Sequence, residues 1–585
     1  MRTVEKPFRT SGRNRAWELL LARFPFLGGT VEALTLFGFT AFFLFYGLVP
    51  IFGGDGLGLV GADEPRYAQV AREMLTRHDY ITPILYGKPW LEKPALYYWR
   101  AMFSFREFGI HDWSARLPSA SFAFVLVTLI FLHIRRFRPG GQLDAALMTA
   151  SAAGILAFAR GASTDMQLAA PLCIGMLGWY AWYETGSKFW LFDLYFFVGA
   201  ATLAKGPVAP FLALIILLAF IALRREWSLL RRTVWWPGIA LYLAMVLPWY
   251  IAVQRRNPNF LRVFFLQHNL ERFATDRYHH SHAFWYYLPI MLLALTPWAV
   301  IAVAAFADAV RGSIAEWKAR GAKFHYIGHT RAGDAFPEFL VLWALIPVLF
   351  FSLSDSKLPG YILPAVPPLT ILCGDYLNRI REQGLRPWLL IAHAVLTGIM
   401  TAFVLLLPVH IVHPHGLPPV NALLAAAMTG FAAIILILIT VARFGVTRLR
   451  IATMVPMIIL LLFVFGVGPV LGIGSIPGSK RTLKLLDLTY SSRPLADTIK
   501  RVESSPNEPV AVFRVRRDVE YGLSFYRNNK VDNYDHDGVP QQQHILVVRE
   551  SYIDDLRPLL KGRTYNPVFT YPAQDLVVYS VDAAK

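Results

Sequence analysis

The chemistry of this chain is first suggested by a charged segment at residues 61–75, GADEPRYAQVAREML. Asp63, Glu64 and Arg66 stand near its start, and apolar residues recur along it at helical spacing. Carboxylates of this kind can remove a proton from an attacking group or stabilise positive charge at a reacting carbon. The same residues also fit a plain helix start, with Asp63 as N-cap and Pro65 in the first turn. We predict a helix here, with Asp63 and Glu64 as candidate catalytic residues.

A second charged segment, GKPWLEKPALYYW at residues 87–99, places Glu92 and Lys93 between two prolines. A helix start in the preceding segment does not explain why this one should be charged as well. The aromatic run that ends at Trp99 also fits the belt that membrane proteins place at the lipid–water interface. We predict that Glu92 and Lys93 contribute to a site, and that Trp99 belongs to the interface.

Four further charged residues stand at the edges of apolar runs. Asp165 lies in ARGASTDM, Lys205 in TLAKGPVAP, Arg272 in QHNLERF and Lys357 in SDSKLPGYILP. Asp165 also fits a helix N-cap, and the cations also fit snorkelling side chains or headgroup contacts. Lys205 has almost no loop around it, and an ionisable residue held at membrane depth indicates a functional site. Such cations suit a phosphate, while carboxylates suit reaction at an adjacent carbon.

The sequence predicts no firm metal site. The stretches YHHSH at 278–282 and HIVHPH at 410–415 contain clustered histidines, but exposed loop histidines are mostly polar surface. A divalent cation near Asp63 or Glu92 is compatible with the residue types without being indicated by them. We therefore expect no required cofactor.

The composition indicates a membrane protein. Of 585 residues, 55% are hydrophobic and only 16% are charged. The net charge of +18 is carried by short basic clusters between apolar runs, which favours loops facing an anionic leaflet over a nucleic-acid partner. The two cysteines, Cys173 and Cys373, stand within apolar runs, so neither a disulfide framework nor a Cys-based metal site is expected.

These residues must be positioned by a set of membrane-spanning helices. Apolar stretches long enough to cross a bilayer number about thirteen. Basic loops alternate along the chain, so the positive-inside rule places them with the basic N-terminus in the cytoplasm and every candidate site residue on the outer face. The predicted spans are 31–52, 117–134, 144–161, 166–183, 188–203, 206–223, 235–254, 284–307, 336–353, 360–377, 387–408, 419–442 and 450–472.

The remaining segments complete the predicted organisation. Residues 1–30 form a basic cytoplasmic N-terminus, and residues 31–473 a transmembrane domain with long outer loops at 53–116 and 255–283. In the first outer loop, an amphipathic helix with Tyr67, Val70 and Met74 on its apolar side is expected to lie on the membrane surface. Residues 474–585 predict a small outer α/β domain, with a helix in RPLADTIKRVE and strands in PVAVFRV, HILVVRE and LVVYSV.

Five motifs in order resemble those of the aminoarabinose transferase family. They are ADEPRYAQVAREML, DYITPILYGKPWLEKPALYYW, LAKGP, QHNLERF and SKLPGYILPAVPPL, and the resemblance runs from about residue 60 to 375. The family comprises integral-membrane glycosyltransferases of the GT-C type, more distantly related to protein O-mannosyltransferases. The resemblance therefore implies a polytopic α-helical membrane protein of the GT-C type. Such a protein would have about thirteen spans, amphipathic juxtamembrane helices in the first outer loop and a small C-terminal α/β domain.

The resemblance also implies roles for individual residues. Asp63 would be the catalytic carboxylate, with Glu64 beside it and Asp165 as a second acidic residue. The residues that would bind substrate are Arg66, Glu92, Lys93, Lys205, His268, Arg272, Lys357 and Tyr361. Of these, Lys205, Arg272 and Tyr361 would hold the phosphate of the carrier lipid, and Glu92 and Lys93 would lie in a loop over the cavity.

The function implied by the resemblance is transfer of a sugar, with inversion, from a polyprenyl (undecaprenyl) phosphate carrier to lipid A or a related glycolipid. The reaction would take place at the periplasmic face of a bacterial inner membrane, without nucleic acid. A transferase acting on protein or another glycan keeps the same core residues and remains open. A lipid-linked sugar flippase fits less well, because transporters usually carry midplane charges and internal repeats. A sensor anchored by the membrane region would not need the paired carboxylates of the first outer loop.

Overall fold

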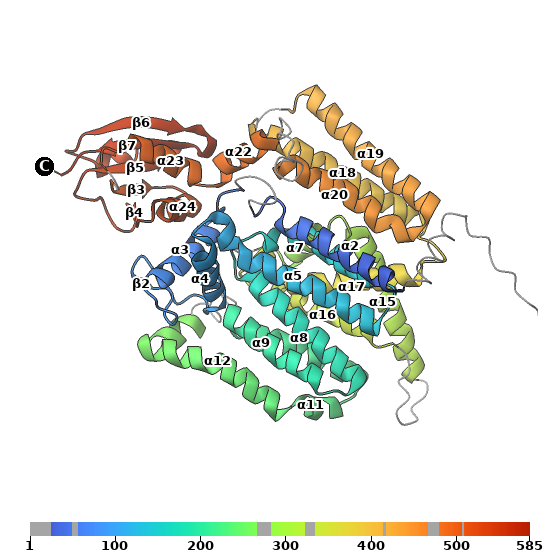
Figure 1. Cartoon of the computed structure of the whole chain (residues 1–585). Helices are drawn as coiled ribbons and strands as arrows, with labels where there is room; N and C mark the ends of the chain where they lie inside the picture. The colour runs from blue at the N-terminus through green and yellow to red at the C-terminus, as the bar shows by residue number, and fades with distance from the viewer. Residues whose placement is uncertain are drawn as a thin grey trace, which may run out of the picture.

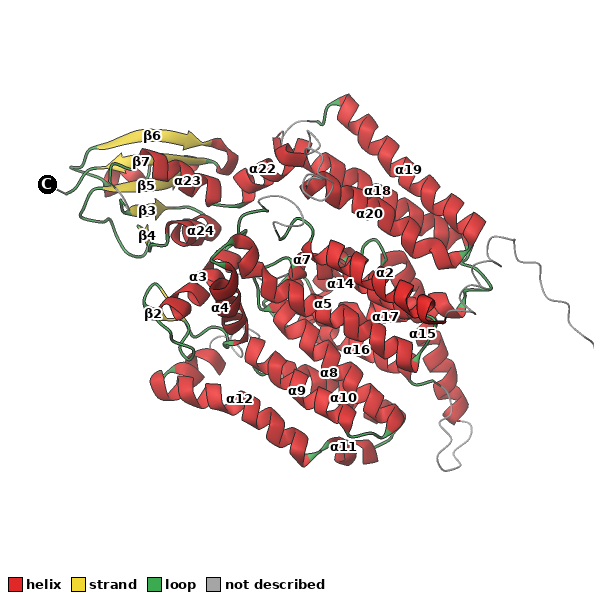
Figure 2. Ribbon diagram, in the orientation of Figure 1, coloured by secondary structure: helices red, strands yellow, loops and turns green. Residues whose placement is uncertain are grey.

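A computed structural model of the chain describes residues 25–49, 56–265, 282–321, 334–412, 417–465, 479–505 and 508–584 (Figure 1). The helical domain fills most of the molecule, and the sheet of the C-terminal domain is set at one end of it (Figure 2). Helices α3 (Asp63–Thr76) and α4 (Leu96–Phe108), which belong to the predicted first outer loop, lie between the two domains (Figure 1). The candidate site residues of α3 therefore lie near a junction between domains.

A helix, or a pair of consecutive helices, overlaps each of the thirteen predicted spans. The bounds are α2 Pro25–Phe45, α5 Asp112–Phe137, α6 Gln142–Ser151, α7 Ala153–Ala159, α8 Asp165–Thr185, α9 Phe189–Lys205, α10 Val208–Arg224, α11 Ser228–Thr233, α12 Trp236–Arg256, η3 Phe284–Tyr286, α14 Tyr287–Ala294, α15 Ala299–Gly321, α16 Phe336–Ser352, η4 Pro359–Ala365, α17 Val366–Arg379, α18 Pro387–Val412, α19 Val420–Phe444, η5 Val446–Arg448 and α20 Leu449–Phe465.

The number of membrane crossings stays a prediction. Within the described residues, five helices are long and apolar enough to cross a membrane, or up to seven if each bent pair counts as one span. The predicted span at 284–307 is bent by 115° at a break that contains Pro297. Several other helices have fewer residues than the roughly twenty that a bilayer core requires. The protein therefore has several candidate membrane spans, and the count of thirteen stays a prediction.

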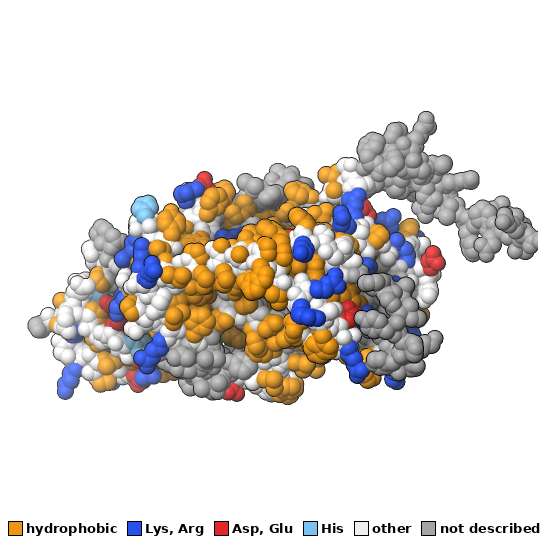
Figure 3. All heavy atoms as spheres, turned by 90° about the horizontal axis from the view of Figure 1, so that it is seen from below, with side chains coloured by type: hydrophobic (Ala, Val, Ile, Leu, Met, Phe, Trp, Pro, Cys, Tyr) orange, Lys and Arg blue, Asp and Glu red, His pale blue; other side chains and the backbone are white. Residues whose placement is uncertain are grey.

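Apolar side chains cover much of the outside of the helical domain. Figure 3 shows a broad apolar area across the middle of one face, with Lys and Arg side chains gathered on either side of it. Exposed large hydrophobic residues of α12 include Trp236, Leu243, Leu247 and Ile251. A surface of this kind is expected where lipid, rather than water, surrounds the protein.

The first outer loop folds into α3 (Asp63–Thr76), a short hairpin of β1 (Ile84–Leu85) and β2 (Lys88–Pro89), and α4 (Leu96–Phe108). Tyr67 and Met74 on the apolar face of α3 are buried, and they pack with residues of α4 and with Phe525 of the C-terminal domain. The prediction that this face rests on the membrane surface is therefore wrong, because protein covers it.

The aromatic run in α4 is also packed inside the protein. Tyr97 and Tyr98 are fully buried, and their rings lie 6.0 and 6.2 Å from the ring of Tyr67. Neither contributes to an interfacial belt. Trp99 is partly exposed, and its indole N–H donates to the carbonyl of Tyr80 at 2.7 Å.

The C-terminal domain is an α/β fold, as its sequence pattern indicates. A mixed sheet in the order β4-β3-β5-β7-β6 has β3 parallel to β4 and β5, while β7 runs antiparallel to β5 and β6. Strands β3, β5 and β7 and helix α23 lie where they were predicted; the expected boundary at residue 474 falls outside the described residues. The bounds are α22 Ser479–Tyr490, α23 Arg493–Val502, β3 Val510–Phe513, α24 Arg517–Arg527, β4 Asp532–Asn533, β5 His544–Arg549, η6 Glu550–Tyr552, α25 Leu556–Leu559, β6 Tyr565–Tyr571, η7 Pro572–Gln574 and β7 Leu576–Val581.

Candidate functional site

Asp63 is the first residue of α3, where Ala62 rather than Asp63 occupies the N-cap position. The expected capping hydrogen bond is not made; the Asp63 carboxylate instead accepts a hydrogen bond from Arg66 Nη2 at 2.5 Å, one helical turn on. The Asp63 side chain is 56% exposed. A negative charge at a helix N-terminus is favourable even without a cap. Asp63 is thus an oriented carboxylate with an open side.

Arg66 links the two charged segments that the sequence singled out. Its side chain is only 7% exposed, and Nη2 lies 3.7 Å from Glu92 Oε2 as well as beside Asp63. The rings of Trp90, Tyr67 and Tyr521 surround it, and their centroids lie 5.1–5.5 Å from the guanidinium carbon. An aromatic ring attracts a cation that lies above its face, so these contacts help to hold the guanidinium in place. Arg66 therefore brings Asp63 and Glu92 to one place.

Glu64 faces away from this cluster and is buried. Its carboxylate pairs with Arg116 at 2.5 Å and accepts further hydrogen bonds from the backbone N–H groups of Val60 and Ala162, each at 2.7 Å. Both oxygens are occupied by protein groups. This environment is that of an anchor that joins α3 to α5 and to the segment before α8, rather than of a residue that reaches substrate.

Asp165 and Lys205 form the second charged pair, at the facing ends of α8 and α9. Lys205 Nζ lies 2.5 Å from Asp165 Oδ1 and 4.9 Å from the ring centroid of Tyr361. The N-cap of α8 is Thr164, so Asp165 does not cap the helix through its side chain. Gly360 allows this contact, because a Cβ there would stand 2.7 Å from the Asp165 carboxylate. The predicted site residues Asp165, Lys205 and Tyr361 therefore lie together.

Lys357 is a buried cation in the loop before η4. Its side chain is 5% exposed, and its ammonium donates to the carbonyl of Ser354 at 2.5 Å. Among the described residues, no carboxylate lies within ion-pair distance of it. A buried ammonium costs free energy unless it is paired. Lys357 is therefore suited to receive an anionic group.

Three predicted residues remain, of which one is buried and two lie outside the described part of the chain. Lys93 follows Glu92 and is buried. His268 and Arg272 fall in residues 266–281, outside the described part of the chain, as does most of YHHSH. Among the described residues, no group of three His, Cys, Asp or Glu side chains could hold a metal ion. Asp63 and Glu92 instead share the guanidinium of Arg66.

The two charged clusters are joined through the anchor residue. Glu64, next to Asp63, binds the amide of Ala162, and Asp165 follows Ala162 by three residues. A short stretch of chain therefore links the cluster around Asp63 to the Asp165–Lys205 pair. That these residues share one face of the membrane, as the alternation of basic loops indicates, stays a prediction.

Three contributors were missed by the sequence analysis. Arg116 stands just before a predicted span, and an arginine at that boundary is a signal for a buried ion pair. Trp90 lies within a motif already singled out, but its contact with Arg66 has no sequence signature. Tyr521 comes from the C-terminal domain, and no local pattern indicates that it would meet Arg66.

Several proteins of known name are similar to this chain over part or most of its length. A family described as dolichyl-phosphate-mannose-protein mannosyltransferase matches residues 92–251. The undecaprenyl phosphate-alpha-4-amino-4-deoxy-L-arabinose arabinosyl transferase of Pseudomonas aeruginosa is 33% identical over 58% of this chain and 59% of that protein. The enzyme of that name from Edwardsiella ictaluri is 29% identical over 60% of each chain. These two matches thus span about 60% of the relatives' length. The enzyme of the same name from Serratia proteamaculans is 26% identical over 82% of this chain and 86% of that protein.

A solved structure has the same fold over nearly the whole chain. The crystal structure of ArnT from Cupriavidus metallidurans bound to undecaprenyl phosphate superposes with a TM-score of 0.71, at 22% identity, over 94% of this chain and 98% of that one. The overlap includes the C-terminal α/β domain as well as the helical domain, since so little of either chain is left out. In sequence this chain is similar to aminoarabinose transferases, and its fold is that of the Cupriavidus protein.

Proposed function

We propose that this protein is an integral-membrane glycosyltransferase that moves a sugar from a polyprenyl phosphate carrier to lipid A or a related glycolipid. The observation that carries the proposal is Asp63, an exposed carboxylate oriented by Arg66. Glu64 beside it links this helix to the segment that carries Asp165, the partner of the largely buried Lys205. A carboxylate that can reach a sugar, beside cations that can hold a phosphate, suits such a transfer.

The donor phosphate would be held by cations around the site. Lys93, Lys205 and Lys357 are all largely buried, so each would interact strongly with a phosphate that excludes water. Tyr361 lies against Lys205 and would contact the same group. By resemblance, Arg272 and His268 would add to this set. The undecaprenyl phosphate bound to the Cupriavidus protein and the names of the relatives agree with a polyprenyl carrier.

The proposed step is a direct displacement at the anomeric carbon. An acceptor oxygen forms a bond to that carbon as the bond to the carrier's phosphate oxygen breaks, with inversion, and the phosphate leaves with the electron pair. The cations would stabilise the negative charge that develops on the leaving phosphate.

The role of Asp63 depends on the acceptor. With a hydroxyl acceptor, Asp63 would take the proton as a general base. A lipid A phosphate is already ionised, so Asp63 would then orient the sugar and stabilise positive charge at its anomeric carbon. A transferase acting on protein or another glycan with the same donor is the second candidate, because the acceptor does not alter the donor site.

The location follows from the alternating basic loops. The site and the C-terminal domain would face the periplasm, and the helical domain would span the inner membrane. The apolar area in Figure 3 supports a membrane-embedded helical domain. The basic residues of the cytoplasmic loops would contact anionic lipid headgroups.

Mass spectrometry of lipid A and total lipids tests the proposal, in cells that make the donor and express either the native chain or Asp63→Asn. A sugar's mass added to lipid A only with the native chain is the expected result, and the mass identifies the sugar class. Unchanged lipid A with consumption of the polyprenyl-phosphate sugar would move the acceptor to protein or another glycan. No change in either pool would overturn the transferase and favour a flippase.

A further inference from the structure

The C-terminal domain is fastened to the first outer loop by one face of α24. Phe525 of α24 is buried among residues of α3 and α4. The guanidinium of Arg72 lies 4.1 Å from the centre of the Phe525 ring, and Arg72 Nη1 donates to the Phe525 carbonyl at 2.8 Å. A further hydrogen bond joins Arg72 to Asn528 at 3.0 Å. This contact combines apolar burial with directed hydrogen bonds, so it fixes the orientation of α24 on α3.

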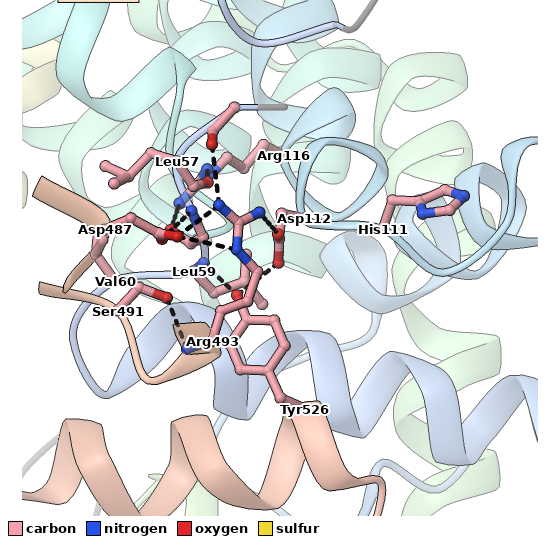
Figure 4. A network of polar contacts seen from close by, with 12 residues as sticks. Leu57, Leu59, Val60, His111, Asp112, Arg116, Asp487, Ser491, Arg493 and Tyr526 are labelled. Atoms are coloured by element: carbon pink, nitrogen blue, oxygen red, sulfur yellow. Dashed lines mark hydrogen bonds and ion pairs between the residues drawn. The ribbon is translucent and has the colours of Figure 1, made fainter. Parts of the chain in front are cut away.

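A second set of contacts holds the segment that leads into α3 (Figure 4). Arg493 pairs with Asp112 and with Asp487, each at 2.7 Å. The hydroxyl of Tyr526 donates to Asp112 and accepts from the backbone N–H of Leu59, each at 2.6 Å. Leu59 lies four residues before Asp63. The domain therefore holds the chain immediately before the candidate catalytic carboxylate.

The same face of α24 also reaches the site itself. Tyr521 stands four residues before Phe525, so both side chains project from one side of the helix. The Tyr521 ring centroid is 5.5 Å from the guanidinium carbon of Arg66, and 5.7 Å from that of Arg517. One wall of the aromatic surround of Arg66 is thus supplied by the C-terminal domain.

We propose that the C-terminal domain completes the active site, with Tyr521 as a positioning residue that acts on Asp63 through Arg66. This inference rests on the proposed transferase function. Three aromatic rings within 5.5 Å of the Arg66 guanidinium carbon leave it little space to turn, so Nη2 stays directed at Asp63. Without the Tyr521 ring, the guanidinium has space to turn, and the Asp63 carboxylate loses its fixed orientation towards the reacting sugar.

The test compares ring and non-ring side chains in the full-length protein, assayed with a polyprenyl-phosphate sugar and the acceptor that the native chain uses. Tyr521→Leu keeps apolar bulk but removes the aromatic face, and Tyr521→Phe keeps the face. We expect kcat to fall about tenfold in Tyr521→Leu, with the donor KM within about twofold of the native value, and Tyr521→Phe to retain the native rate. The control Tyr565→Leu, on the edge strand β6, should not change either constant.

Two further measurements separate positioning from folding. Limited proteolysis should give the same resistance for Tyr521→Leu and the native chain, because the Phe525 and Tyr526 contacts remain. In an Arg66→Ala background, Tyr521→Leu should lower the residual kcat by less than about twofold, since its effect passes through Arg66. A native kcat in Tyr521→Leu, or an equal loss in Tyr521→Phe, would overturn the proposal. An inactive native chain would overturn the transferase function instead.

Discussion

Asp63 and Glu64 are consecutive in the chain, yet their carboxylates lie in opposite environments. Asp63 is 56% exposed and bonded to Arg66, whereas Glu64 is 9% exposed and bonded to Arg116. At the start of a helix, successive side chains point in different directions, about 100° apart. One carboxylate is therefore open to a ligand, and the other joins three segments of the protein. We expect loss of the Asp63 carboxylate to lower activity and loss of the Glu64 carboxylate to lower stability.

Asp63→Asn and Glu64→Gln form a matched pair of variants. Asp63→Asn should lower kcat by about 100-fold or more and leave the thermal unfolding temperature nearly unchanged, because the lost charge acts in the reaction. Glu64→Gln should lower the free energy of unfolding by about 3 kcal/mol, since Arg116 would be left buried without its anion. Thermal unfolding in detergent and turnover of each variant measure the two effects.

The control for that pair is Glu107→Gln, at an exposed residue that pairs with the exposed Arg106. It should change neither kcat nor stability, because surface ion pairs contribute little. If Glu64→Gln were as stable as the native chain but inactive, Glu64 would be catalytic and not an anchor.

The Asp165–Lys205 pair can be separated into its structural and binding roles. Lys205→Met alone should destabilise the protein by about 2 kcal/mol, because it leaves the partly buried Asp165 uncompensated. Adding Asp165→Asn should recover most of that stability. If Lys205 binds the carrier phosphate, the donor KM should stay raised about tenfold in the double variant. Recovery of both stability and donor KM would assign the pair to structure alone.

Lys357→Met tests whether a buried cation serves the donor. The substitution preserves length and removes a charge that has a single hydrogen bond, to Ser354, among the described residues. Stability should stay the same or rise, because burial of an unpaired ammonium is costly. The donor KM should rise about tenfold or more if the ammonium binds phosphate. Native donor KM in a stable Lys357→Met protein would remove Lys357 from the site.

The C-terminal domain should lose stability in mild acid because of His544. Nδ1 of His544 contacts the Gln542 carbonyl at 2.8 Å, and Nε2 contacts the Tyr534 hydroxyl, which fits a neutral ring that donates from Nδ1. Burial lowers the pKa of His544 from its ordinary value of 6.5. Just below pH 6.5 the unfolded state therefore binds a proton that the folded state does not. The stabilisation is complete well above pH 6.5 and declines as the pH falls below it.

Hydrogen exchange of the β5 amides measures this pH effect locally. Protection in the native chain, relative to His544→Gln at the same pH, should decrease between pH 7.5 and about 5.5. The Gln variant has no group that titrates at this position, so it corrects for the intrinsic pH dependence of exchange. A constant ratio over that range would contradict the expected titration.

The local elements of this protein were determined by its sequence. The helix at 63–76 and the strands of the C-terminal domain follow from short-range periodicity, because neighbouring side chains decide which face is apolar. The alternation of basic loops predicts that Asp63, Glu92, Asp165 and Lys205 face the same side of the membrane. The motif resemblance gave the fold type, since those motifs are local as well.

Only the tertiary structure decided what each charged residue contacts. Glu64 is hydrogen-bonded to Arg116, 52 residues away in the chain. Arg66 contacts the ring of Tyr521, which is more than four hundred residues away. It also decided that the apolar face of α3 is covered by Phe525 rather than by lipid. An amphipathic pattern states that a face must be buried, but the partner depends on how distant elements dock. For that reason Asp63 and Glu64 look equivalent in the sequence and differ in the folded protein.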